Sequence, residues 1–381
     1  FRKGSNANTA LGLRIRALSR SGHFFSVLLL LVSCSPDSSP PTPPSLQAWL
    51  DTVPLFTLGS VEGDGPEGFT SIQAVALSQD GSLAVTENSP LEIRVFDSLG
   101  QHRVTIGRDG EGPGEFVGAP KIRFLGPDTL LAWDPGQFRL TWFSMDGQVI
   151  RELSLAAQVN ESSSGQNFVT GWWDLLPDGS VLAPDSINTR SLYVLGTNPP
   201  SVQRIASLHG HFPPLVRGVK VRSLRVFTPF RTSTAYAVGG AGTIWVSDST
   251  RWSVSAFDPD GSLKGEFHIG KGRTPVSADL IEAAVKANQA DFPNIPPGLL
   301  EDAFDQLEHP DSVSAIGHLF WEPPGFLWVG HHMGLYQPAT DFEVLTDNGE
   351  WLGHISIPTS LGIVWAVGHG RMVTVWRDEL G

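Results

Sequence analysis

One pattern recurs along most of the chain and constrains its fold more than any other feature. Each copy contains a strand, a tight turn with glycine, a second strand ending in a polar residue, a third strand, another turn and a fourth strand. The clearest copy consists of Ile72–Ser78, Asp80–Gly81, Leu83–Glu87, Ile93–Asp97 and Val104–Gly107. Alternating apolar residues are typical of half-buried strands, and an Asp-Gly step is typical of a hairpin.

The spacing of the first turns gives the period of this repeat. These turns fall near Gly81, Asp128, Gly179, Gly242, Gly325 and Gly370. Four short strands in a base period of about 45–50 residues are the signature of β-propeller blades. We therefore expect an all-β, six-bladed β-propeller, with blades near 71–107, 119–155, 171–208, 233–270, 314–358 and 361–381.

The two ends of the chain are expected to meet in the last blade. Leu55–Gly59 and the glycine-rich loop after it look like Val104–Gly107 and its loop, so this segment is a fourth strand without a blade before it. Its natural place is the outer strand of the last blade, where it removes an open edge. The C-terminal blade then offers Ile363–Val367 and Met372–Trp376. One strand of that blade is then missing, and the chain looks like a fragment at both ends.

The glycine-rich loop carries a family resemblance. Residues 106–116 read Ile-Gly-Arg-Asp-Gly-Glu-Gly-Pro-Gly-Glu-Phe. This run resembles the NHL-like six-bladed propeller lipoproteins of bacteria, most of which are uncharacterised. The resemblance covers residues 49–381. It implies the fold and a place in the cell envelope more than it implies an activity.

The N-terminal residues have the pattern of an export signal. Three arginines precede an apolar run at residues 24–32, which is followed by Ser33 and then Cys34, the single cysteine of the chain. The run is shorter than the roughly 20 residues that span a bilayer, but it suits the core of a signal peptide. Leu31–Cys34 resembles the bacterial lipobox, in which the cysteine is acylated. The alternative is an ordinary secretory signal with an incidental cysteine.

These observations divide the chain into three parts. We expect a signal peptide with a lipobox at 1–34, a flexible tether at 35–48 and the propeller at 49–381. Cys34 is then the lipidation site. The protein is expected in the cell envelope, lipid-anchored at the outer membrane and facing the periplasm or the exterior. The lipid is its expected membrane contact.

Each second strand ends in a polar residue at the same structural place. These residues are Glu87, Asp134, Asp185, Asp248, His331 and Asp378. Propeller connectivity places them on one face, so they could form a cation or polar-ligand ring that takes Ca²⁺. Alternatively, each carboxylate caps its own loop by accepting backbone N–H bonds. The repetition of the acid in every blade favours capping.

Charge is unevenly distributed along the chain. The net charge is −13, which argues against a nucleic-acid partner. Residues 186–247 nevertheless contain no acid and include Arg217, Arg222, Arg225 and Arg231 on the long connection between the third and fourth blades. We expect these arginines to bind an anionic ligand, since guanidinium groups suit carboxylate and phosphate. Alternatively, they pair with acids of neighbouring blades.

Residues 277–309 predict a helical insertion between the fourth and fifth blades. Ser277 can cap a first helix, and a second helix follows the prolines at 293–297. The pair is interpreted either as a lid over the loop face or as a helical hairpin packed on the blade edge.

Enzyme motifs are weak. The chain has no Gly-x-Ser-x-Gly elbow, no His-Glu-x-x-His site and no phosphate-binding Gly-Lys-Ser/Thr loop. We expect a non-catalytic, envelope-anchored propeller that binds a protein, peptide, glycan or small anionic ligand on its loop face. The alternative is a calcium-dependent lactonase or other hydrolase, or an NHL-type lyase, on the same fold, because fold alone does not decide function.

Overall fold

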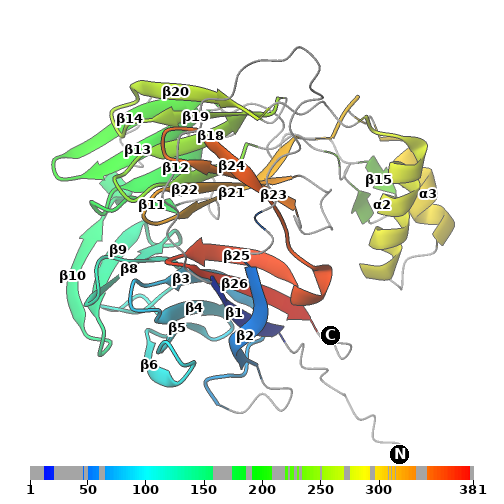
Figure 1. Ribbon diagram of the computed structural model, residues 1–381. Coiled ribbons are helices and arrows are strands. Elements are labelled where there is room, and N and C mark those ends of the chain that lie inside the picture. The colour runs from blue at the N-terminus through cyan, green and yellow to red at the C-terminus, as the bar shows by residue number, and fades with distance from the viewer. Residues whose placement is uncertain are drawn as a thin grey trace, which may run out of the picture.

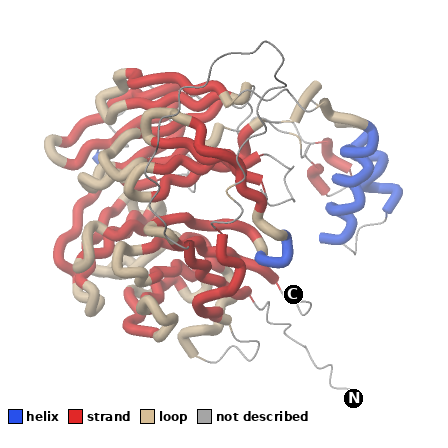
Figure 2. Tube along the Cα trace, in the orientation of Figure 1, coloured by secondary structure: helices blue, strands red, loops and turns tan. Residues whose placement is uncertain are grey.

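The protein is built almost entirely of β-strands. Its computed structural model describes residues 13–20, 46, 50–59, 65–157, 174–185, 191–207, 219–221, 224–226, 230, 234–248, 251–269, 275–291, 297–307, 309, 311–313, 315–331 and 341–377. Their strands form sheets arranged around a common axis, and two α-helices lie to one side of them (Figures 1 and 2). The prediction of an all-β propeller is confirmed.

Five four-stranded antiparallel sheets are each made of strands that follow one another in the sequence. The first sheet contains β3 (Ile72–Leu77), β4 (Leu83–Asn88), β5 (Leu91–Phe96) and β6 (His102–Ile106). The second contains β7 (Lys121–Phe124), β8 (Thr129–Asp134), β9 (Arg139–Ser144) and β10 (Val149–Ser154). The third contains β11 (Asp174–Leu175), β12 (Val181–Asp185), β13 (Ser191–Thr197) and β14 (Pro200–Ser207).

The other two sheets of this kind come later in the chain. One contains β17 (Tyr236–Val238), β18 (Ile244–Asp248), β19 (Ser253–Phe257) and β20 (Leu263–His268). The next contains β21 (Ile316–Glu322), β22 (Phe326–His331), β23 (Asp341–Thr346) and β24 (Trp351–Ser356). All five sheets lie within the blade ranges that the repeat predicts. The turn after the first strand needs glycine in the left-handed region, as at Gly81 (φ 86°) and Gly179 (φ 84°).

A last four-stranded sheet joins the two ends of the chain and corrects the expected sixth blade. Its order is β25 (Ile363–Gly368), β26 (Arg371–Arg377), β1 (Leu13–Arg20) and β2 (Leu50–Leu58). The outer strand is close to the expected 55–59, but the third strand comes from residues that sequence analysis assigns to a signal peptide. The physical reason lies in the sequence Leu-Arg-Ile-Arg-Ala-Leu, whose alternation suits a strand. Without it, β26 and β2 would each present an unpaired edge.

The first strands of the sheets surround the axis. β3 contacts β7, β7 contacts β11, β11 contacts β17, β17 contacts β21, β21 contacts β25, and β25 contacts β3. The hydrophobic core lies between adjacent sheets rather than at one centre. On β4, for example, Leu83 and Val85 pack toward the sheet of β25 and β26, while Ala84 packs toward the second sheet. The second strands are therefore continuous apolar runs, because both of their faces are buried.

Two helices stand between β20 and β21 in the sequence. They are α2 (Ala278–Asp291) and α3 (Pro297–Asp305), and Ser277 caps the first with a hydrogen bond to the Leu280 N–H (3.3 Å). Their apolar faces pack on each other around Leu300 and Phe304, and α3 contacts the short hairpin of β15 (Val219–Val221) and β16 (Leu224–Val226). Within the described residues, no helix is long and apolar enough to cross a membrane.

Candidate functional site

Glu87, the first residue of the expected polar ring, caps a loop. Its side chain is fully buried at the end of β4. It accepts hydrogen bonds from the backbone N–H groups of Thr70 (3.1 Å), Ser71 (2.5 Å) and Asn88 (3.2 Å), and from the Thr70 hydroxyl (3.1 Å). These bonds connect Thr70 and Ser71, just before the first strand of the blade, to the end of its second strand.

Asp134 does the same in the next blade. The side chain is 1% exposed, and its two oxygens accept from the N–H groups of Val117 (2.8 Å), Gly118 (3.1 Å) and Gly136 (2.7 Å). A fourth bond comes from the Gln137 amide (3.0 Å). This arrangement matches the capping interpretation, since the lone pairs of both oxygens are already used.

The other ring residues divide into three cases. The Asp185 side chain and Asp378 lie outside the described residues. Asp248 lies 3.8 Å from the Arg251 guanidinium. In the part of the chain that the structure describes, Glu87, Asp134 and Asp248 belong to no group of three metal-binding side chains, whereas His331 does.

The predicted anion-binding arginines are not placed by the structure. Arg217, Arg222 and Arg231 fall outside the described residues, and Arg225 is described only by its backbone in β16, opposite Lys220. Their role stays a prediction.

The glycine-rich loop is organised around Glu115. This carboxylate accepts from the Gly112 N–H (2.8 Å) and from the Arg108 guanidinium (2.7 Å). These contacts hold the pKa of Glu115 below its usual range. Hydrogen bonds between its own residues therefore help to stabilise the glycine-rich loop.

A cluster of ionisable side chains lies on three neighbouring inner strands, and the sequence pattern does not predict it. It consists of Lys121 and Arg123 on β7, Asp174 on β11 and Tyr236 on β17, here called the axial cluster. All four side chains are half-buried. Arg123 crosses between blades, donating from Nη1 to the Leu175 carbonyl (2.7 Å). Among the described residues, no hydrogen bond or ion pair within 4 Å involves the Lys121 ammonium.

Burial shifts the pKa values of all four groups. Burial lowers the pKa values of Lys121 and Arg123, and the negative charge of Asp174 opposes both shifts. Burial raises the pKa of Asp174, against the effects of Arg123, the Leu175 N–H and Lys121. Burial also raises the pKa of Tyr236, and the charge of Asp174 adds to that shift. Two cations therefore face one carboxylate, and perturbed groups of this kind mark candidate functional sites.

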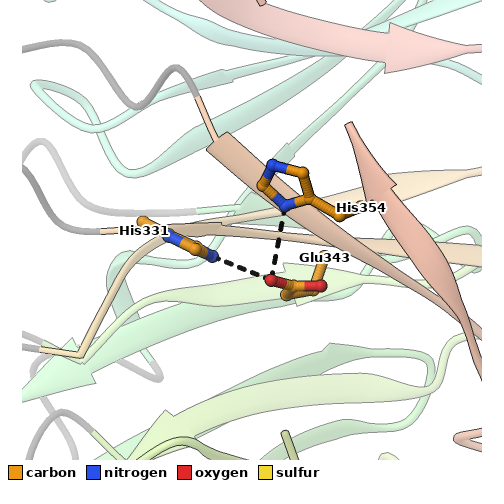
Figure 3. Close-up of side chains that lie close together, drawn as sticks. All are labelled: His331, Glu343 and His354. Carbon is orange, nitrogen blue, oxygen red and sulfur yellow. Dashed lines mark hydrogen bonds and ion pairs between the residues drawn. The ribbon is translucent and has the colours of Figure 1, made fainter. Parts of the chain in front are cut away.

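A second group forms at the outer part of one blade. His331 at the end of β22, Glu343 on β23 and His354 on β24 have ligand atoms that all lie within 4.8 Å of one another. Figure 3 shows both imidazole rings directed at the Glu343 carboxylate. Sequence analysis singles out His331 alone, because only the strand register brings the other two residues beside it.

Comparisons with known proteins identify no family. No protein-family model matches the chain, and no curated protein matches it. Among solved structures, a streptogramin B lyase is similar at 13% identity and a TM-score of 0.39, over 80% of this chain and 74% of that one. A DUF4221 family member from Bacteroides vulgatus matches at 12% identity and TM-score 0.43, over 81% and 94%.

A gluconolactonase from Xanthomonas campestris is also similar, at 14% identity and TM-score 0.40, over 81% of this chain and 87% of that one. The structural neighbours are β-propeller proteins. Similarity at this level does not transfer an activity, so membership of the NHL-like lipoproteins stays a prediction.

Proposed function

We propose that this protein is an envelope propeller that binds a small anionic ligand at the axial cluster, through Lys121 and Arg123. The observation that carries the proposal is the pair of cations on β7. Among the described residues, Asp174 is the one negative charge that acts on both of them. An excess of positive charge close to the axis is costly unless an anion joins it.

The rest of the molecule makes this location distinctive. The chain has a net charge of −13, so a local positive site stands out against an acidic background. Enclosed charges interact with a ligand more strongly than exposed ones, because less water screens them. The axial cluster is therefore the best-supported place for selective anion binding.

The chemistry of the two cations suggests the ligand class. Arg123 uses one guanidinium nitrogen on the Leu175 carbonyl, and its remaining N–H groups suit a carboxylate or phosphate oxygen. Lys121 adds a compact point charge. Arg217, Arg222, Arg225 and Arg231 would extend the site to larger anions such as an acidic peptide or glycan.

The proposal includes two wider expectations. The composite sheet would close the ring as a sixth blade, supported by the contact between β25 and β3. The competing expectation is lipidation at Cys34, supported by the apolar run before it, which would hold the propeller in the envelope but would remove β1 together with the signal peptide. The calcium-dependent hydrolase alternative gains less support, because the metal-binding group found among the described residues contains two histidines, whereas Ca²⁺ prefers oxygen ligands.

Replacing Lys121 tests the proposal, with citrate and inorganic phosphate as probes in isothermal titration calorimetry. Lys121→Met should weaken binding about tenfold or more, the equivalent of one charge-assisted hydrogen bond. The same change should raise the melting temperature of the ligand-free protein, because it removes a half-buried charge. Asp174→Asn should act in the opposite direction on affinity and strengthen binding.

The matched control is Arg151→Met on β10, a cation on an outer strand that lies over the Trp142 ring (4.7 Å). It should leave anion binding unchanged. Failure of the wild-type protein to bind either probe, or equal affinities for the Lys121 and Arg151 variants, would count against the axial cluster as the site.

The pH dependence of stability gives an independent check. Burial holds the pKa of Lys121 below 10.5, so in the pH range between its folded pKa and 10.5 the unfolded chain binds more protons than the folded one. The contribution of Lys121 to stability therefore rises as pH rises through this range. Lys121→Met should be more stable than wild type at neutral pH, and this difference should shrink in alkaline solution. Urea unfolding of both proteins across pH measures it.

A further inference from the structure

We propose that His331, Glu343 and His354 bind a divalent transition-metal ion of the Zn²⁺ class. The three residues come from three adjacent strands of one sheet. In the strand register, Glu343 lies directly opposite His354 on β24 and directly opposite Val329 on β22. His331 lies two residues after Val329 on β22. All three side chains therefore share one face of the sheet.

This face is turned toward the neighbouring blade. Phe342 packs with the sheet of β25 and β26, while Leu345 packs with Trp245 on the other side, so Glu343 shares the side of Leu345. Trp252, between β18 and β19, places its ring edge against His331 with centroids 4.7 Å apart. The group is thus held between two blades, and Glu343 is only 2% exposed.

The distances suit a shared ion. Glu343 Oε1 lies 3.2 Å from His331 Nε2 and 3.4 Å from His354 Nδ1. Two ligand atoms that each lie about 2.1 Å from a tetrahedral ion are about 3.4 Å apart. The other carboxylate oxygen, Oε2, accepts from the Trp351 indole N–H (2.9 Å), which fixes the orientation of the carboxylate.

Hydrogen bonding at the far side of His354 orients its ring. The Ser356 hydroxyl donates to Asp341 Oδ1, so its oxygen accepts from His354 Nε2 (3.0 Å). This bond turns the ring so that Nε2 faces Ser356 and Nδ1 faces Glu343 Oε1. Among the described residues, the buried Nδ1 has no hydrogen-bond partner. A cation of the Zn²⁺ class would bind this nitrogen and the Glu343 carboxylate together.

The surrounding residues have the form of a metal site's outer shell. Metal-binding histidines usually donate their other ring nitrogen to a carboxylate or an equivalent acceptor, and Ser356 and Asp341 supply this to His354. Two imidazoles and one carboxylate favour Zn²⁺ and similar ions over Ca²⁺. Three protein ligands leave a tetrahedral ion one position for a solvent oxygen.

The test is metal titration of tag-free protein carrying Cys34→Ser, after dialysis against a chelator. Wild type should bind one equivalent of Zn²⁺ and no Ca²⁺, and Co²⁺ should give the visible absorption of a four-coordinate site. His354→Gln should weaken Zn²⁺ binding about a hundredfold or more, and Asp341→Asn about 10–100-fold. Circular dichroism checks that each variant keeps its sheets.

His268→Gln is the control, because His268 is an exposed histidine on β20. It should bind Zn²⁺ as wild type does. Absence of stoichiometric Zn²⁺ binding in the wild type would overturn the site, as would equal affinities for the His354 and His268 variants. The axial-cluster variants play no part in this test, so the two proposals can fail separately.

Discussion

Replacing Arg16 with proline is expected to lower the free energy of unfolding of the intact chain by about 1–3 kcal/mol, the cost of leaving a ladder acceptor unpaired. Arg16 lies in the middle of β1, opposite Thr374 of β26 on one side and Thr57 of β2 on the other. In a strand paired on both sides, each N–H takes part in a ladder bond, which proline cannot make. Urea unfolding of protein whose intact N-terminus is verified by mass spectrometry measures the loss.

Arg16→Thr is the matched control, since it keeps the backbone N–H and a residue that favours strands. It should unfold within about 0.5 kcal/mol of wild type. The comparison also decides between two assignments of residues 13–20. If both variants unfold at the same urea concentration as the wild type, the sheet does not need β1 for its stability. That result would favour the signal-peptide assignment of residues 13–20.

Asp134→Ala is expected to destabilise the protein by about 1–3 kcal/mol. The change leaves the partly buried N–H bonds of Val117, Gly118 and Gly136 without their acceptor. Each unsatisfied buried donor costs about 1–3 kcal/mol, reduced wherever water can enter. Urea unfolding provides the measurement.

Two further variants sharpen this result. Asp134→Asn keeps the shape but offers one acceptor oxygen in place of two, so its loss of stability should be intermediate. Asp128→Ala removes an exposed carboxylate on the turn between β7 and β8 and should have little effect. A loss for Asp134→Ala no larger than that for Asp128→Ala would refute the capping role.

The candidate sites show where sequence reasoning reached its limit. Glu87 and Asp134 could be placed at strand ends because each blade repeats the same local pattern. Their capping bonds reach residues just before the first strand of the same blade. Lys121 carries no such signal. It occupies an ordinary strand, and its significance comes from Asp174 on the next blade.

The sequence by itself determined the repeat, the all-β propeller and the ranges of five sheets. Hairpins are local, so turn glycines and alternating apolar residues are sufficient to specify them. Only the tertiary structure decided which distant segments meet: β1 between β26 and β2, Lys121 beside Asp174, and His354 beside Glu343. These contacts depend on strand register and on closure of the ring, and no local pattern encodes either of them.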